Sequence, residues 1–304
     1  MKSFRRLFGI TFSIVCISAG QGLKADSATP PGLRLLESAP PVEGHLADPL
    51  VYWSETRTTP RALTIHFVRL DLTSKDYELI TIPSADPDGP GPYEATLEMP
   101  AVLMKRSEAI VAVNGSAFQN PNNREDYNWH EGKSVDIHGL IVAGGAIVSP
   151  PEAPRASFWV DASGLPKIGT PEDTSVVQAS ISDWNNLTPT LSGQLIKAGQ
   201  VCIKPGGNPH PRTAIGFDAS GRFVTFAVVD GRQVGYSEGC TLIELAEIMQ
   251  AAGCAEAINL DGGGSSILIS NHLENPILNK PSGQSPRPIP VMIGVREARP
   301  TPKK

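Results

Sequence analysis

The stretch AINLDGGGSSILIS, residues 257–270, decides how the fold and the chemistry of this chain are interpreted. Its first half is an apolar run that predicts a buried strand, and the run stops at Asp261. Three glycines and two serines follow before a second apolar run begins. Because glycines let a backbone approach a bound group closely, the stretch predicts a strand end where Asp261 faces a ligand. The alternative is a tight turn that Asp261 merely caps.

The spacing of these glycines excludes the dinucleotide-binding fingerprint, because Ile267 stands where GxGxxG requires a third glycine. The chain also lacks the phosphate-binding GxxxxGK[ST]. What remains is a turn whose backbone N–H groups can approach an anion, with two hydroxyl groups as further donors. The predicted donors are Gly262, Gly263, Gly264, Ser265 and Ser266.

The residues before this stretch predict the clearest helix of the chain, TLIELAEIMQAAG at 241–253. Apolar residues recur there at helical spacing, Thr241 suits the N-cap and Gly253 suits the C-terminal cap. A helix that leads into a strand and a glycine turn is typical of a mixed domain whose site lies at strand ends. The sequence therefore predicts an α+β fold, a strand-rich mixed sheet with a few helices in a single catalytic-type domain.

Segments that alternate like strands dominate the rest of the chain. RALTIHFVRLDL, residues 61–72, alternates well, and YELITIP, residues 77–83, is expected to be its hairpin partner. A first, shorter helix is expected within residues 93–108, with a break near Pro100.

The N-terminus has the pattern of an export signal, a basic start followed by an apolar run of about the right length. We interpret residues 1–25 as a signal peptide and the proline-rich residues 26–51 as an extended tether. Residues 52–298 form the predicted domain, and residues 299–304 a short tail. The protein is expected to be exported, periplasmic or secreted, and to meet a membrane only through the signal segment. An uncleaved anchor is the alternative.

Composition argues against a nucleic-acid partner. The full chain has a net charge of −5, and removal of the four basic residues of the signal leaves 22 basic against 31 acidic residues. No basic run compensates for this excess of acid. Three cysteines follow the signal, which allows one disulfide and one free thiol. The predicted helix separates Cys240 from Cys254 too far for a bridge, whereas a bond between Cys202 and Cys240 stays open.

Polar side chains end or begin three other apolar segments. Asp230 ends FAVVDGR as Asp261 ends its own strand, and Asn114 ends AIVAVNG. Arg212 follows the stiff loop NPHP and opens an apolar strand, where a held guanidinium would suit a phosphate. Each residue also has a structural interpretation, as a turn former or an ion pair. His210 is interpreted as a loop histidine rather than a catalyst.

A second acidic and histidine-rich segment follows Asn114. His130, Glu131, Asp136 and His138 include metal-ligand residue types, but the two histidines are eight residues apart without a helical pattern. No metal site is assigned there, and no cofactor is required, although a divalent cation stays open.

Several motifs in order resemble the phosphodiester glycosidase domain family, over about residues 52–296. The opening strand and the asparagine turn are similar, and Ser116 and Ala117 depart from the family's glycine and phenylalanine at that turn. The remaining matches are IHGLIVAGGAIVS, LSGQLIKAGQ, PRTAIG, VVDGRQ, TLIELAEIMQAAGC, INLDGGGSS and PSGQSPRPIPVMIGV. In the last of these an arginine, Arg287, precedes the final strand.

The resemblance implies an exported hydrolase that cleaves the glycosidic C–O bond of a sugar-1-phosphodiester in a cell-envelope or extracellular glycan. Asp261 and Asp230 become the expected catalytic carboxylates, and the partner a phosphorylated or anionic carbohydrate. The expected substrate-binding residues are Arg212, Asn114, Thr213, Gly262, Gly263, Gly264, Ser265, Ser266 and Arg287. Two alternatives remain, a non-catalytic exported glycan-binding protein on the same fold and a metal-dependent phosphodiesterase.

Overall fold

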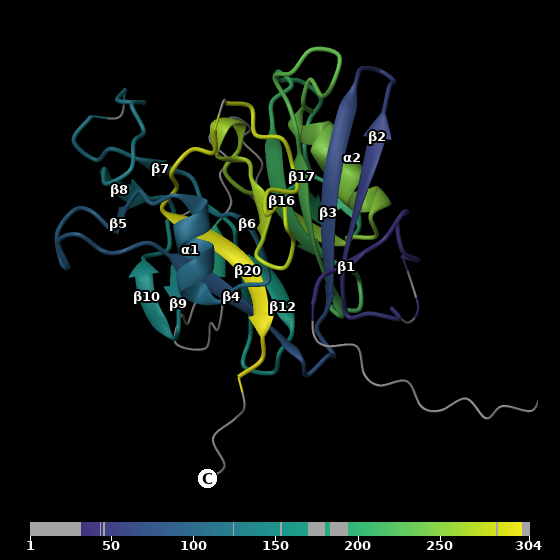
Figure 1. Ribbon diagram of the computed structural model, residues 1–304, viewed down its shortest axis with the longest axis horizontal. Coiled ribbons are helices and arrows are strands. Elements are labelled where there is room, and N and C mark those ends of the chain that lie inside the picture. The colour runs from purple at the N-terminus through teal and green to yellow at the C-terminus, as the bar shows by residue number, and fades with distance from the viewer. Residues whose placement is uncertain are drawn as a thin grey trace, which may run out of the picture. The chain divides into compact units, whose positions relative to one another are not determined.

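A computed structural model describes residues 32–169, 180–182 and 194–299, except residues 43, 45, 124, 153 and 284. These residues form two α-helices and many strands in five sheets, which confirms the predicted strand-rich α+β class (Figure 1). None of the helices described is long and apolar enough to cross a bilayer. The predicted signal peptide lies outside the described residues.

The largest sheet has eight strands, and all neighbours in it are antiparallel except the first pair. Its strands come from both the N-terminal and the C-terminal parts of the chain. In spatial order they are β1 (Arg34–Leu35), β2 (Leu50–Arg57), β3 (Leu63–Asp71), β17 (Phe223–Val229), β16 (Arg212–Phe217), β18 (Glu256–Asn259), β14 (Ile196–Lys197) and β15 (Gln200–Val201).

A four-stranded antiparallel sheet lies beside it, and three smaller pairings complete the fold. The four-stranded order is β19 (Leu268–Ser270), β6 (Val111–Asn114), β20 (Val291–Glu297) and β4 (Tyr77–Pro83). The smaller sheets are β12 (Pro166–Gly169), β11 (Ser157–Val160) and β13 (Ser180–Ser182), then β5 (Ala95–Thr96), β8 (Ser134–Ile137) and β7 (Phe118–Gln119), and the hairpin of β9 (Ile141–Ala143) and β10 (Ala146–Ser149).

The expected hairpin between β3 and β4 is wrong. β3 pairs with β2 along one edge and with β17 along the other, so neither edge is free for β4. The chain instead crosses to the four-stranded sheet, where β4 pairs with β20 from Pro83 opposite Val291 to Tyr77 opposite Glu297.

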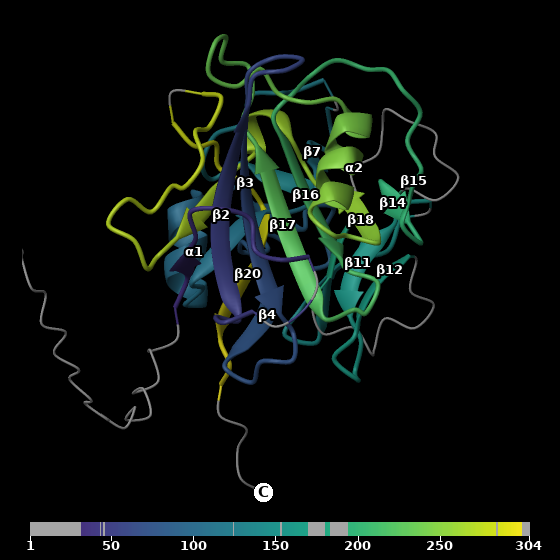
Figure 2. The same cartoon turned by 90° about the vertical axis from the view of Figure 1, so that its right-hand side faces the viewer.

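Three apolar layers hold these elements together. The first lies between the two large sheets and contains residues such as Val68, Phe226 and Ile293. A second layer joins the large sheet to α2 (Leu242–Ala251), and a third joins the four-stranded sheet to α1 (Pro100–Ser107). The helices therefore cover the outer faces of two packed sheets, and Figure 2 shows them on opposite sides of the sheets.

Both helices begin where local chemistry favours a start. Thr241 caps α2 in a capping box with Glu244, as the sequence predicts for an N-cap threonine. Gly253 follows its C-terminus in a left-handed conformation, at φ +87°. Pro100 is the first residue of α1 rather than a break within a longer helix, because proline lacks only an N–H group that would be unpaired there.

The prediction of an extended tether fails for residues 32–51. β1 pairs with β2, which begins at Leu50, and the buried side chains of Leu46 and Leu50 belong to the core. The guanidinium of Arg69, buried in the large sheet, donates to the carbonyl of Pro41 at 2.9 Å. The apolar residues of this segment therefore pack against the domain rather than leaving it.

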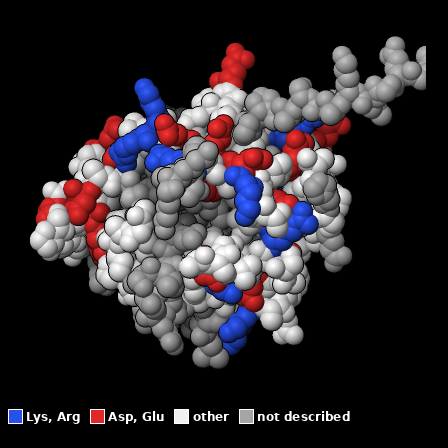
Figure 3. Space-filling view, turned by 90° about the horizontal axis from the view of Figure 1, so that it is seen from below, with Lys and Arg blue, Asp and Glu red and all other residues white. Residues whose placement is uncertain are grey.

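Cys202, Cys240 and Cys254 carry free thiols, so the open pairing of Cys202 with Cys240 is not formed. Burial raises the pKa of the Cys240 and Cys254 thiols to about 12 each, which suits small apolar core residues. On the face drawn in Figure 3, the basic and acidic side chains of the described residues are interspersed.

Candidate active site

A cavity of about 280 Å³ opens where several segments at strand ends meet. Its lining comes from β7, from the segments that follow β6, β7, β17 and β18, from the segment that enters β16, and from the segment before β20, which adds Arg287. Its lining is cationic on one part and aromatic on another. The lining residues are Ala117, Phe118, Tyr127, Trp129, His210, Arg212, Arg232, Asp261, Gly262, Gly263, Gly264 and Arg287.

Asp261 is held on both sides of its backbone. Its N–H donates to the carbonyl of Gly115 at 3.0 Å, and its own carbonyl accepts from the Asn114 side chain at 2.7 Å. Its carboxylate accepts from the Gly262 N–H at 2.8 Å, and the side chain is only 8% exposed. This burial raises the pKa of Asp261, and the neighbouring Arg287 acts in the opposite direction.

Arg287 is the ionic partner of Asp261, with Nη2 at 3.3 Å from Oδ2. The same nitrogen donates to the hydroxyl of Ser265, and the guanidinium lies 5.4 Å from the centre of the Phe118 ring. Burial lowers the pKa of Arg287, and the charge of Asp261 raises it. The attraction between the two charges therefore offsets part of the free-energy cost of burying each of them.

Most backbone donors of the glycine turn are used inside the protein. The N–H groups of Gly262, Gly263, Ser265 and Ser266 all donate within the protein, and Gly264 lines the cavity. The missing side chains matter instead: a Cβ on Gly263 would lie 3.0 Å from Nη2 of Arg232. A Cβ on Gly264 would lie 3.4 Å from Nη1 of Arg287. Gly263 and Gly264 therefore admit two guanidinium groups, whereas Ser265 and Ser266 are buried outside the lining.

Two arginines bring positive charge to the pocket without a partner acid. Arg212 is buried at the start of β16, where its Nε donates to the carbonyl of Cys240 at 3.3 Å. Within the described ranges neither Arg212 nor Arg232 forms an ion pair. Burial lowers the pKa of Arg212, and the charge of Arg232 contributes. Two unpaired guanidinium groups at one cavity suit an anion.

His210 lines the same cavity as these two arginines. Its Nδ1 is buried and has no hydrogen-bond partner among the residues described. Burial lowers the pKa of His210, and the charges of Arg212 and Arg232 lower it further. A histidine in this setting is neutral at pH 7, so that it can accept a proton.

Asn114 and Thr213 lie behind Asp261 rather than in the lining. The Asn114 side-chain oxygen accepts from the Thr213 hydroxyl at 2.8 Å and from the Ile267 N–H at 3.1 Å, while its nitrogen holds the Asp261 carbonyl. Both side chains are buried, and their hydrogen bonds fix the backbone of the site.

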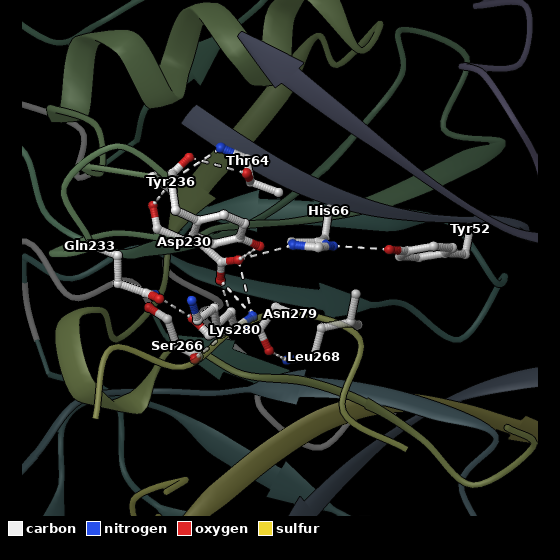
Figure 4. Close-up of polar contacts among 11 residues, drawn as sticks. Tyr52, Thr64, His66, Asp230, Gln233, Tyr236, Ser266, Leu268, Asn279 and Lys280 are labelled. Atoms are coloured by element: carbon white, nitrogen blue, oxygen red, sulfur yellow. Dashed lines mark hydrogen bonds and ion pairs between the residues drawn. The ribbon is translucent and has the colours of Figure 1, made fainter. Parts of the chain in front are cut away.

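Asp230 is also away from the cavity, at the centre of a buried network (Figure 4). Its carboxylate contacts Nε2 of His66 at 3.1 Å and accepts from the Tyr236 hydroxyl at 3.0 Å. It accepts further from the Asn279 side chain at 2.9 Å and from the Lys280 N–H at 3.0 Å. The expected pairing of two carboxylates in one site is therefore not found, since the lining of the cavity contains one, Asp261.

Three aromatic side chains form the rest of the wall. The Trp129 ring contacts Phe118 edge-to-face at a centroid distance of 4.9 Å, and Tyr127 at 6.3 Å. Tyr127 is 75% exposed. The cavity thus combines an acid, unpaired cations and aromatic rings, which is a lining suited to a carbohydrate that carries a negative charge.

A family model described as phosphodiester glycosidase matches residues 107–296, which contain every residue of this lining. The chain belongs to the phosphodiester glycosidase family. No curated protein sequence matches the chain. Among solved structures, the catalytic domain of zebrafish N-acetylglucosamine-1-phosphodiester α-N-acetylglucosaminidase, auto-inhibited by its pro-peptide, is similar at a TM-score of 0.58 and 20% identity. The similarity covers 81% of this chain and 82% of that one.

A hypothetical protein from Synechocystis is similar at a TM-score of 0.51 and 15% identity, over 82% of this chain and 64% of that one. At such identities these two similarities concern the fold alone. They agree with the single strand-rich domain described above.

Several lining residues of this phosphodiester glycosidase domain were missed in the sequence. Arg232 stands two residues after Asp230 in VVDGRQ, where only the aspartate is a predicted site residue. His210, which the sequence suggests is a loop histidine rather than a catalyst, lines the cavity. Phe118, Tyr127 and Trp129 have no periodic pattern, and three aromatic residues in one polar loop segment are the only signal that could have found them.

The histidines and the aspartate of the metal-ligand types in residues 130–138 each contact a different partner. His130 contacts the backbone of Glu131, and His138 contacts Glu152 at 3.1 Å. Asp136 accepts from Gln119 at 2.8 Å. The part of the chain that the structure describes contains no group of three residues placed to hold a metal ion.

Proposed function

We propose that the protein is an exported hydrolase that cleaves the glycosidic C–O bond of a sugar-1-phosphodiester in a cell-envelope or extracellular glycan. One observation carries the proposal: a single carboxylate, Asp261, lies in a cavity with Arg212 and Arg232, which have no acidic partner among the described residues. Family membership supports the reaction type. The printed name of the zebrafish protein specifies an N-acetylglucosamine-1-phosphodiester, which supports a sugar bound to phosphate as the substrate class.

The charges of the cavity match a phosphodiester. Asp261 and Arg287 neutralise each other, so Arg212 and Arg232 leave an excess of positive charge. Arginine offers a planar fork of donors that fits phosphate oxygens. We assign the phosphate to Arg212 and Arg232, and Asp261 to the anomeric carbon. Asn114 and Thr213 support Asp261 rather than contact the substrate, whereas Gly262, Gly263 and Gly264 line the cavity.

Hydrolysis breaks the bond between the anomeric carbon and the bridging oxygen, and the electron pair leaves with the phosphate. A phosphomonoester is a good leaving group that Arg212 and Arg232 stabilise, so no strong general acid is needed. The carboxylate of Asp261 stabilises positive charge on the anomeric carbon. Water supplies the new oxygen, and neutral His210 accepts the proton that this water loses.

A single carboxylate leaves two stereochemical outcomes to measure. Attack by Asp261 followed by water gives retention of the anomeric configuration, whereas direct attack by water gives inversion. The anomer released first, followed by NMR, distinguishes them. Asp230 has no part in either route, and its role in this proposal is to position neighbouring loops.

A non-catalytic glycan-binding protein on the same fold is the second candidate function. The observation that favours it is the absence of Asp230 from the cavity, which removes the second carboxylate of the two-carboxylate mechanism. Ala117, which lines the cavity at a departure from the family pattern, adds to it.

The test uses the chain from residue 26 to 304 and a panel of α-sugar-1-phosphodiesters in heavy-oxygen water, with and without a chelator. Label recovered in the sugar supports C–O cleavage, and label in the phosphate contradicts it in favour of a phosphodiesterase. Binding of the panel without turnover supports the glycan-binding candidate. Loss of activity with chelator would show that a divalent cation takes part in the reaction, which the proposed residue roles do not require. Export is tested separately, by locating the protein in cell fractions.

A further inference from the structure

Tyr127 is an exposed aromatic ring that the proposed chemistry does not use. Its side chain lines the cavity, yet the residue is 75% exposed. Large aromatic side chains that stay in contact with water lose the free energy of burial, so a fixed one at a cavity is typical of a binding surface.

The Tyr127 ring contacts a second aromatic ring that is itself packed and fixed. Trp129 meets Tyr127 at an interplanar angle of 89° and also contacts Phe118 edge-to-face. The ammonium group of Lys133 lies 4.5 Å from the centre of the Trp129 ring. Lys133 is in turn fixed by Asp126 at 2.7 Å and by the carbonyl of Asn128 at 2.8 Å.

The same wall is connected to the reacting group. Phe118 lies under the guanidinium of Arg287, which is the ionic partner of Asp261. Arg212 and Arg232 come from other segments of the chain, at the start of β16 and after β17. A ligand whose phosphate binds those arginines therefore has its other part available for the aromatic wall.

We propose that Tyr127 is the platform on which the pyranose ring with the scissile bond stacks, which makes it a determinant of specificity for cyclic sugars. The C–H groups on one face of a pyranose form an apolar surface that matches an aromatic face, while its hydroxyl groups stay in contact with water. Trp129, Phe118 and Lys133 position the platform. The identity of the reaction rests on the proposed function, whereas the contact with the sugar does not.

The test measures binding rather than turnover, with methyl α-pyranosides of several sugars and with inorganic phosphate as separate probes. We compare the wild type, Tyr127→Ala and Tyr127→Phe by NMR titration. Tyr127→Ala is expected to weaken pyranoside binding at least tenfold and to leave phosphate binding within twofold. Tyr127→Phe, which keeps the ring, is expected to stay within threefold of the wild type for both probes.

Three outcomes overturn the proposal: a wild type that binds no pyranoside, a Tyr127→Ala variant that binds pyranosides as the wild type does, or a Tyr127→Phe variant as weak as the alanine variant. The last would assign the contact to the hydroxyl rather than the ring. The heavy-oxygen assay keeps the two proposals apart. Pyranoside binding that depends on the Tyr127 ring, without C–O cleavage, would refute the hydrolase and support the platform.

Discussion

Nη2 of Arg287 lies 3.3 Å from Oδ2 of Asp261, and burial acts against both charges of this pair. It raises the pKa of Asp261 and lowers the pKa of Arg287, while each charge partly offsets the effect on the other. Removal of either side chain therefore leaves a buried charge without its partner. The consequences differ for the two sides, because a substrate anion can replace a carboxylate beside Arg287.

Asp261→Asn is expected to lower turnover by at least ~10³-fold, because it removes the one carboxylate of the lining while the side chain keeps nearly the same size. The same substitution frees Arg287, so we expect inorganic phosphate to bind several-fold more tightly. Rate measurements and calorimetric titration check these two effects. Turnover within tenfold of the wild type would remove Asp261 from the mechanism. A loss of both turnover and phosphate binding would point to a collapsed site.

Arg212→Gln and Arg232→Gln are expected to raise KM for a phosphodiester, since each removes charged donors to the phosphate. Charge-assisted hydrogen bonds contribute about 1.5–3 kcal/mol, so the loss for the buried Arg212 is expected to be about tenfold to a hundredfold. The effect for the exposed Arg232 is expected to be smaller and to shrink with added salt. Steady-state kinetics at two salt concentrations check this ranking, with the exposed Arg299→Gln as the control. Equal KM values in all three variants would contradict the phosphate assignment.

Local patterns predicted a large part of the fold and of the site. The capped helix α2 and the acid at the end of β18 are both encoded within a few consecutive residues, by periodicity and capping chemistry. Arg212 and Arg287 also line the cavity, and the expectation for Arg287 comes from the resemblance to the family rather than from a local pattern. The predictions of α2 and of the strand that ends at Asp261 depend on short-range order along the chain.

The rest depends on segments that meet only in the folded protein. Asp230 and Asp261 are nearly equivalent in sequence, since each ends an apolar strand and precedes glycine. Asp230 is covered by Asn279 and Lys280, 49 and 50 residues further along the chain, and Asp261 is not. The position of β4 also depends on distant segments, because the hairpin with β3 is excluded only by the pairing of both β3 edges with other strands. No local pattern distinguishes these cases.

Asp230→Asn is expected to destabilise the fold rather than to abolish the chemistry. The carboxylate accepts from several buried donors, and an amide group would place its own N–H groups against some of them. Breaking a buried charged network costs about 3–5 kcal/mol, so we expect a destabilisation of about 2–4 kcal/mol for this milder change. Denaturant unfolding measures it, with the exposed turn variant Asp76→Asn as the control.

The same variant tests the placement of Asp230 outside the reaction. Activity for each folded molecule should stay within about tenfold of the wild type, at a temperature well below the unfolding transition. A loss of about 10³-fold from a fully folded Asp230→Asn protein would restore the carboxylate to the catalytic role that its position in the sequence suggested.

The acid limb of kcat/KM should report both proton-accepting groups of the cavity. Burial and the charges of Arg212 and Arg232 lower the pKa of His210 from its ordinary 6.5, and burial raises the pKa of Asp261 from its ordinary 3.8. Both groups act without their proton, so activity is expected to increase with pH along an acid limb. The His210 contribution to this limb is expected below pH 6.5 and the Asp261 contribution above pH 3.8.

Arg232→Gln removes one of the charges that lower the pKa of His210, so its acid limb should move upward toward pH 6.5. His210→Gln should lower activity by about 10²–10⁴-fold and leave a limb that belongs to Asp261 alone. A pH–rate series on the wild type and both variants measures these shifts. If the limb of Arg232→Gln coincides with that of the wild type and His210→Gln remains fully active, His210 transfers no proton and the water is activated by Asp261.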